Sequence, residues 1–139
     1  MAATATARWE GSLDEGSGTI STGAGLQGTY TKASRFADGT GTNPEELIGA
    51  AHAACFSQFL ASLLSKNGTP PTSIETGAKV SIVVGDDGPS INRIDLSTVV
   101  DVDLTVEEIT TFATQAKSAC PVSKALAGVE DVRLDVSKA

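Results

Sequence analysis

Thiol and imidazole groups are scarce in this sequence of 139 residues, which contains two cysteines, Cys55 and Cys120, and one histidine, His52. They show no CxxC or HxxxH spacing, so they do not form a recognisable zinc-binding set. Basic and aromatic residues are also few: ten Lys and Arg face 17 Asp and Glu, and there are four Phe, one Tyr and one Trp. The sequence therefore offers little to neutralise phosphates or to stack on bases, which excludes nucleic acids and anionic membranes as expected partners.

The N-terminal segment MAATATARWEG lacks the cationic start and the apolar run that are typical of a secretory signal. We therefore expect a cytoplasmic protein. Because thiols are kept reduced in that compartment, we expect a redox-active or catalytic cysteine pair rather than a permanent disulfide.

Residues 47–64 carry no formal charge and approach the length of a membrane span. Polar side chains such as His52 and Gln58 lie within this stretch, and two glutamates precede it. These features predict a helix that is surrounded by protein rather than by lipid.

The length of the chain fits a single domain, which we expect to span residues 1–139. Alternating apolar residues and turn-forming residues predict strands near 4–9, 18–22, 28–33, 74–84, 91–102 and 129–136. Helix signals, including the start Asn43-Pro44, predict helices near 44–66, 105–119 and 121–127. Strands grouped around one long helix predict an α+β domain with mostly antiparallel pairing.

Cys55 lies in the middle of the long predicted helix, among alanines and next to Phe56. A free cysteine in such a place is commonly an inert small hydrophobic residue, and burial raises its pKa. Reactivity requires a cation nearby. The candidates are Arg35, His52 and Lys66, and Arg35 lies just outside the helix, in the loop-like segment Ser34-Arg35-Phe36. The alternative for Arg35 is an ordinary solvated surface arginine.

Cys120 stands directly before Pro121, at the expected start of a short helix. The partial positive charge of a helix N-terminus favours a thiolate. The alternative is a cysteine that only ends one helix and caps the next.

His52 precedes Cys55 by three residues on the same helix face, which suggests a Cys–His dyad. A structural histidine is the favoured interpretation, because stacking along one helix leaves little room for a substrate and no third orienting group is apparent. Glu45 suits the first turn of the helix. It lies about 15 Å along the helix from Cys55, so it can only orient a shared arginine or act from a partner chain.

The segments GTNPEELIGAAHAACFS and ACPVS resemble the OsmC/Ohr family of thiol peroxidases, and the OsmC branch more closely than the organic hydroperoxide resistance branch. The resemblance extends from ARWEG through SRF and PTSIET to the last predicted strand. It implies an OsmC-like fold, a tightly intertwined homodimer with two active sites at the interface, and no metal or organic cofactor.

The same resemblance implies a role for four residues. Cys55 matches the peroxidatic thiolate, which becomes a sulfenic acid, and Cys120 matches the resolving thiol that closes an intramolecular disulfide. Arg35 matches the arginine that stabilises the thiolate and the leaving oxygen, and Glu45 matches the glutamate that orients this arginine. The implied substrates are organic hydroperoxides, with hydrogen peroxide as a second candidate. The implied reductant is a small dithiol, with lipoyl proteins implicated for relatives, and the implied role is antioxidant defence in the stress response.

Two alternatives remain open from the sequence. One is a non-enzymatic dimeric module that binds a small ligand in an apolar pocket, with both cysteines merely packed. The other is a protein with a permanent disulfide. For the dimer, the small residues 49–51 predict an antiparallel crossing of two central helices near residue 50, which would bring Glu45 of one chain level with Cys55 of the other.

Overall fold

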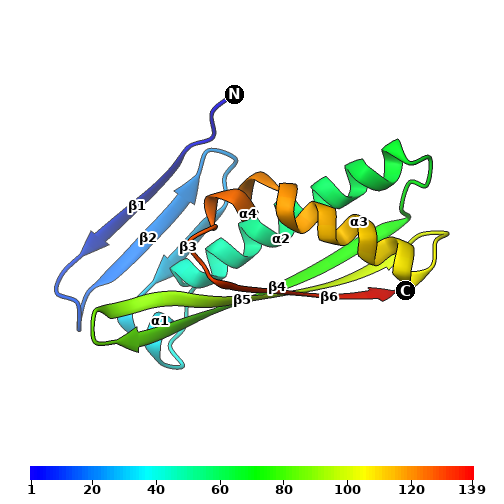
Figure 1. Cartoon of the computed structure of the whole chain (residues 1–139). Coiled ribbons are helices and arrows are strands. Elements are labelled where there is room, and N and C mark those ends of the chain that lie inside the picture. The colour runs from blue at the N-terminus through cyan, green and yellow to red at the C-terminus, as the bar shows by residue number, and fades with distance from the viewer. The chain divides into compact units, whose positions relative to one another are not determined.

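Strands and helices follow one another in the order β1, β2, β3, α1, α2, β4, β5, α3, α4, β6 in the computed structural model, which describes residues 1–139 (Figure 1). They divide into two units, residues 1–47 and residues 48–139. The long helix α2 (Pro44–Lys66) begins in the first unit and continues through the second. The α+β class expected from the sequence is confirmed, whereas the single domain over 1–139 stays a prediction.

The first unit contains an antiparallel meander of β1 (Ala5–Glu10), β2 (Ser17–Thr22) and β3 (Gln27–Tyr30). The strand expected at 28–33 ends at Tyr30, because a short helix, α1 (Lys32–Phe36), follows. The Thr31 hydroxyl accepts from the Ser34 N–H at 3.0 Å, and the Ser34 hydroxyl accepts from the Thr31 N–H at 2.9 Å. Serine here replaces the usual Glu or Gln of a capping box. The loop-like segment expected around Arg35 is therefore helical.

The expected start and end of α2 are confirmed. The Asn43 side-chain oxygen accepts from the Glu46 N–H at 2.8 Å, and Pro44 is the first helical residue, where its missing N–H costs nothing. The Glu46 carboxylate accepts from the Thr42 hydroxyl at 2.9 Å instead of closing a capping box. The helix stops at Lys66, and Gly68 adopts a positive φ of 82° that favours glycine.

The second unit contains a three-stranded sheet in the order β4, β5, β6. Its strands are β4 (Ser73–Gly85), β5 (Gly88–Asp101) and β6 (Asp131–Lys138). A tight turn joins β4 to β5 in an antiparallel hairpin, whereas β6 pairs with β5 in parallel. Parallel pairing needs a crossover connection, which α3 (Val106–Ala119) and α4 (Pro121–Ala125) provide.

The core of the second unit lies between this sheet and the helices α2 and α3, which lie along one side of it in Figure 1. The alternation predicted for β5 is confirmed, because every second side chain from Ile94 to Val102 is buried and Val99 is 40% exposed. Opposite these side chains, α2 contributes Phe56, Leu60 and Leu64, and α3 contributes Ile109, Ala113 and Ala116. Cys55 is therefore positioned on the rigid core helix, next to a fully buried phenylalanine.

By length and composition alone, α2 is long and apolar enough to cross a membrane, with a mean hydropathy of 1.6 over 18 residues. Three of its large side chains, Phe56, Leu60 and Leu64, are fully buried in the protein core. Only 28% of the apolar window is buried within the chain, however, and residues such as Ala50, Ala51 and Ala54 are exposed. Much of the α2 surface is thus apolar and uncovered.

Candidate active site

Cys55 on α2 and Cys120 at the start of α4 place their sulfur atoms 2.7 Å apart, and both are free thiols. The two residues are 65 positions apart in the sequence, so the crossover through α3 and α4 brings them together. Cys120 is fully buried, whereas Cys55 is partly exposed. A reagent that arrives from solvent therefore reaches the Cys55 sulfur first.

The position of Cys120 is set by the junction of two helices, as the sequence predicts. Its N–H donates to the Ala116 carbonyl at 2.9 Å, which ends α3, and its carbonyl accepts from the Lys124 N–H at 3.1 Å, which begins α4. Pro121 occupies the first position of α4, where a helix needs no N–H. Backbone hydrogen bonds on both sides thus hold Cys120 in place.

The surroundings of the two thiols shift their pKa values in opposite directions. Burial raises the pKa of Cys55 above its ordinary value, and the hydrogen bond with Cys120 adds to this effect. Burial acts the same way on Cys120, but hydrogen bonds from the Cys55 thiol, Ser123 and Val122 outweigh it and lower the pKa of Cys120. Within the second unit these interactions favour the thiolate on Cys120 and disfavour it on Cys55.

Arg35 and Glu45 form an ion pair in the first unit. Arg35 Nη2 lies 2.7 Å from Glu45 Oε1, and Arg35 Nε lies 3.2 Å from both carboxylate oxygens. Glu45 is 8% exposed, and the guanidinium carbon of Arg35 lies 5.1 Å from the centre of the Phe36 ring. The bidentate carboxylate and the ring hold the guanidinium plane in one orientation.

A cavity of about 270 Å³ lies beside Arg35 in the first unit. Its walls are mostly apolar or aromatic and include Trp9, Leu13, Tyr30, Phe36 and Pro44. The Trp9 and Tyr30 rings lie 5.4 Å apart, which is typical of a tilted aromatic pair. The sequence analysis did not select these aromatic residues, because no local pattern links them to Arg35.

His52 is fully buried, and its Nε2 lies 2.8 Å from the Ser123 hydroxyl oxygen. Its Nδ1 has no hydrogen-bond partner, and burial lowers the pKa of His52. The hydrogen bond of His52 thus goes to α4 and not to the Cys55 sulfur, which is contrary to a simple Cys–His dyad. Ser123 was not selected from the sequence, although it follows Cys120 by the same three residues by which His52 precedes Cys55.

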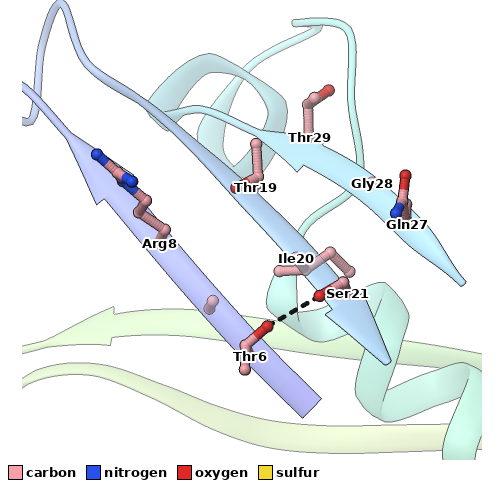
Figure 2. A pocket seen from close by; sticks show the side chains of 9 residues that line it. Thr6, Arg8, Thr19, Ile20, Ser21, Gln27, Gly28 and Thr29 are labelled. Atoms are coloured by element: carbon pink, nitrogen blue, oxygen red, sulfur yellow. Dashed lines mark hydrogen bonds between the residues drawn. The ribbon is translucent and has the colours of Figure 1, made fainter. Parts of the chain in front are cut away.

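A larger hollow, of about 600 Å³, lies along the meander of the first unit (Figure 2). Figure 2 shows hydroxyl side chains such as Thr6, Thr19, Ser21 and Thr29 around it, with a hydrogen bond between Thr6 and Ser21. The two cysteines and the Arg35–Glu45 pair do not line this hollow. Volume therefore does not identify the reactive site. The chain also brings no three His, Cys, Asp or Glu side chains together that could hold a metal ion.

Comparison with known proteins relates this arrangement to one family. Residues 37–135 match the family described as OsmC-like protein. The chain is 46% identical to peroxiredoxin OsmC of Escherichia coli K12 over 123 residues, which cover 86% of each protein. It is 34% identical to organic hydroperoxide resistance protein-like 2 of Staphylococcus epidermidis over 104 residues, or 71% of this chain and 70% of that protein. It also matches the crystal structure of an organic hydroperoxide resistance protein OsmC from Legionella pneumophila with a TM-score of 0.78 and 26% identity, over 96% of each chain.

Proposed function

We propose that this chain, which belongs to the OsmC-like protein family, reduces organic hydroperoxides with Cys55 and Cys120. The chain is a cysteine peroxidase, as the names of its relatives in both branches of the family indicate. The observation that carries the assignment of roles is the close sulfur pair with one partly exposed and one buried member. The expected resemblance and the OsmC-like fold are confirmed by the comparisons.

The chemistry needs two thiols that react in sequence. The Cys55 thiolate attacks the terminal oxygen of the hydroperoxide, the O–O bond breaks, and the alkoxide takes up a proton and leaves as an alcohol. Cys55 is then a sulfenic acid. The Cys120 thiolate attacks its sulfur, the S–S bond forms, the S–O bond breaks, and hydroxide leaves and takes up a proton to form water. A dithiol supplies two electrons and restores both thiols by exchange.

We assign Arg35 as the cation that stabilises the Cys55 thiolate. The groups around Cys55 in its own unit raise its pKa, so a guanidinium is needed both to hold the thiolate and to stabilise the charge that develops on the leaving oxygen. Glu45 keeps this guanidinium oriented through its bidentate contact. The Arg35 that serves a given Cys55 comes from the first unit of the same chain or of a partner chain.

The cavity beside Arg35 supports an organic hydroperoxide as the substrate. An alkyl or aryl group that contacts the aromatic and aliphatic walls makes the binding free energy more favourable, because apolar surface leaves water. Hydrogen peroxide has no apolar part that could make these contacts. We therefore expect organic hydroperoxides to be turned over with a higher kcat/KM than hydrogen peroxide.

A homodimer is supported by the uncovered surface of α2. Of its apolar window, 28% is buried within the chain, and a helix that is apolar all round needs cover on all sides. Gly49 packs against its own sheet, because a Cβ at this position would lie 3.3 Å from the Ala78 carbonyl oxygen. Ala50 and Ala51 are exposed, so they are the small residues at which a partner helix can approach.

The reductant we propose is a small dithiol, free or carried as a lipoyl group on a protein. Because Cys120 is fully buried and Cys55 is partly exposed, the reductant attacks the disulfide at the Cys55 sulfur. A slender dithiol reaches this atom more readily than a folded thiol protein does. We propose the cytoplasm as the location, because such reductants are maintained there.

The test is steady-state consumption of several alkyl hydroperoxides and of hydrogen peroxide, with dihydrolipoamide, thioredoxin or glutathione as the reductant. We expect turnover that is fastest with an organic hydroperoxide and dihydrolipoamide. Free thiols counted after one equivalent of peroxide should fall from two to none for each chain. Thiols that persist in peroxide would instead support a binding module with packed cysteines, and thiols that never appear after mild reduction and return to air would support a permanent disulfide.

A further inference from the structure

Two side-chain contacts link α2 to the start of α4, and their residues are separated by the same spacing on both segments. Cys55 and Cys120 meet at 2.7 Å, and His52 and Ser123 meet at 2.8 Å. His52 lies three residues before Cys55, and Ser123 lies three residues after Cys120. Residues three apart lie on the same face of a helix, so the His52–Ser123 bond is adjacent to the sulfur pair.

We propose, on the basis of the function proposed above, that His52 and Ser123 are positioning residues for the resolving step. In this arrangement His52 Nε2–H donates to the Ser123 hydroxyl oxygen, and the Ser123 hydroxyl hydrogen is directed to the Cys120 sulfur, where it stabilises the thiolate.

The direction of the His52–Ser123 bond follows from the inventory of donors. A serine hydroxyl has one hydrogen, so a hydroxyl that donated to His52 would have none for Cys120. With the proton on Nε2, the buried and unpartnered Nδ1 of His52 is a bare acceptor rather than an orphaned N–H donor. The effect on Cys120 agrees with this direction: burial opposes the thiolate, but hydrogen bonds from Cys55 and then from the N–H and hydroxyl of Ser123 lower the pKa of Cys120.

The contribution of Ser123 becomes decisive after Cys55 has been oxidised. In the reduced protein Cys120 donates to the Cys55 sulfur, and when Cys120 is ionised the hydrogen bond with Cys55 lowers the pKa of Cys120. Once Cys55 is a sulfenic acid, its sulfur carries no hydrogen and the S–H donor to Cys120 is lost, whereas the Ser123 hydroxyl keeps its hydrogen. The thiolate then attacks the Cys55 sulfur, the S–S bond forms, and hydroxide leaves and takes up a proton. When a dithiol later reduces the disulfide, it attacks the Cys55 sulfur, the S–S bond breaks, and Cys120 leaves as the thiolate that Ser123 stabilises.

Burial favours the neutral form of His52. Burial lowers its pKa, and the charged groups that face it from α3 and α4 are Lys117 and Lys124, which line the same cavity of about 250 Å³. Asp131, at the start of β6, interacts with Lys117 and with Arg133. The pH dependence of resolution therefore reports the titration of Cys120 and not that of His52.

The test follows both chemical steps by stopped-flow fluorescence and quenched intact-mass measurement after one equivalent of an alkyl hydroperoxide. In Ser123→Ala and His52→Phe we expect the sulfenic acid to form and the disulfide to form about tenfold more slowly at pH 7, with the pH profile of resolution shifted upward by about one unit. Ser123→Thr keeps a hydroxyl and His52→Gln keeps a donor near Nε2, so both should restore the rate. Ser118→Ala is the matched control, because the Ser118 hydroxyl lines the same cavity but donates to the Gln115 carbonyl of its own helix.

The thiolate absorbance of Cys120 at 240 nm, titrated in the Cys55→Ser background, provides a second readout. We expect Ser123→Ala to raise the pKa of Cys120 there as well. An unchanged pH profile of disulfide formation in Ser123→Ala would overturn the proposal. The proposal would also be overturned if neither Ser123→Thr nor His52→Gln restored the rate of disulfide formation and the unfolding midpoint of these variants fell. If the proposed peroxidase function were wrong, the wild-type protein would instead form no sulfenic acid at all.

Discussion

At the scale of single residues, the two cysteines differ in properties that assign them separate tasks. Cys55 is accessible but its surroundings disfavour the charged form, whereas Cys120 is buried and its hydrogen bonds favour the charged form. The first thiol must meet a substrate and so needs access, and the second must attack a neighbour 2.7 Å away and needs none. Because its surroundings raise the pKa of Cys55, a positive charge beside this thiol would favour its reactive form.

The first prediction concerns the separate tasks of the thiols. Cys55→Ser should abolish peroxide consumption and keep the fold, because serine is nearly isosteric but its hydroxyl is a far weaker nucleophile. Cys120→Ser should react once and stop with Cys55 as a sulfenic acid or a higher oxide. Intact mass separates the outcomes, since a disulfide loses two hydrogens and an oxidised thiol gains oxygen. Sustained turnover by Cys55→Ser would contradict the mechanism.

The second prediction concerns Arg35. In a Cys120→Ser background, Arg35→Ala should raise the pKa of Cys55 by about one to three units, because an adjacent positive charge favours the thiolate. Glu45→Gln should have a smaller effect, since it loosens the guanidinium without removing it. Thiolate absorbance at 240 nm measures the pKa, and Lys32→Ala is a matched control, because Lys32 lines the same cavity but pairs with Asp14. An identical titration in Arg35→Ala would remove this residue from the mechanism.

Mixed dimers decide which chain supplies the arginine. A dimer of one Arg35→Ala chain and one Cys55→Ser chain retains a single site with both residues only if Arg35 acts across the interface. Activity near half of the wild-type value would show action between chains, and no activity would show action within a chain.

The residues that sequence reasoning selected and those that it missed differ in the kind of signal they carry. Cys55 and Cys120 were selected because cysteine is rare in this chain, and the resemblance to the OsmC/Ohr family added Arg35 and Glu45 and gave all four residues their roles, which stay predictions. Ser123 is one of many serines, and its importance depends on a contact with His52 across 71 residues of chain. Such a contact leaves no local pattern, although the equal spacing of three residues on both segments was visible.

At the scale of elements, helix boundaries were predictable wherever a capping residue stands beside a helix-forming run. The α3 helix is an example: the Thr105 hydroxyl accepts from the Glu108 N–H at 3.3 Å, and the Glu108 carboxylate accepts from the Thr105 N–H at 2.8 Å. The short helix α1 was missed because its capping box uses Ser34 at the third position. The parallel pairing of β6 was also not predictable, since strand direction depends on the path of the crossover and not on the alternation within the strand.

The third prediction concerns the α3 capping box. Thr105→Ala should lower the free energy of unfolding by about 1 kcal/mol, because the Glu108 N–H loses the hydroxyl that accepts its hydrogen bond. Urea denaturation with an unchanged m-value measures this effect. Thr110→Ala is the matched control, because the Thr110 hydroxyl donates to the Val106 carbonyl within the same helix and caps nothing. Equal midpoints for the two variants would contradict a capping role.

The fourth prediction follows from the titration of Glu108. Hydrogen bonds from the N–H and hydroxyl of Thr105 lower the pKa of Glu108 below its ordinary value of 4.5. A depressed pKa in the folded state means that this stabilisation is present above pH 4.5 and is lost as the pH falls through the folded-state value. The difference in urea midpoint between wild type and Glu108→Gln should therefore shrink as the pH is lowered from 7 to 3. A difference that does not depend on pH would refute the titration argument.

At the scale of the whole molecule, the exposed face of α2 is the feature that a single chain leaves unexplained. The helix has the composition of a core element, yet 28% of its apolar window is buried within the chain. A symmetric partner would cover this face with the same surface, which is the common solution in homodimers. If two chains cross in antiparallel directions near residue 50, Glu45 of one chain lies level with Cys55 of the other, since both residues are five positions from residue 50 along α2.

The last prediction tests this crossing. Ala50→Trp should disrupt assembly and peroxide turnover together, because an indole at an exposed small residue prevents two helices from approaching closely, while leaving the core of the chain untouched. Ser65→Trp places the same bulk on an exposed position at the end of α2 and serves as the control. Light scattering gives the mass, and hydroperoxide consumption gives the activity. If Arg35 and Cys55 of different chains form one site, the Ala50→Trp monomer should lose activity even though its Cys55–Cys120 pair, which lies within a single chain, still forms a disulfide under a mild oxidant. A fully active monomer would contradict the shared site and would place Arg35, Cys55 and Cys120 in one chain.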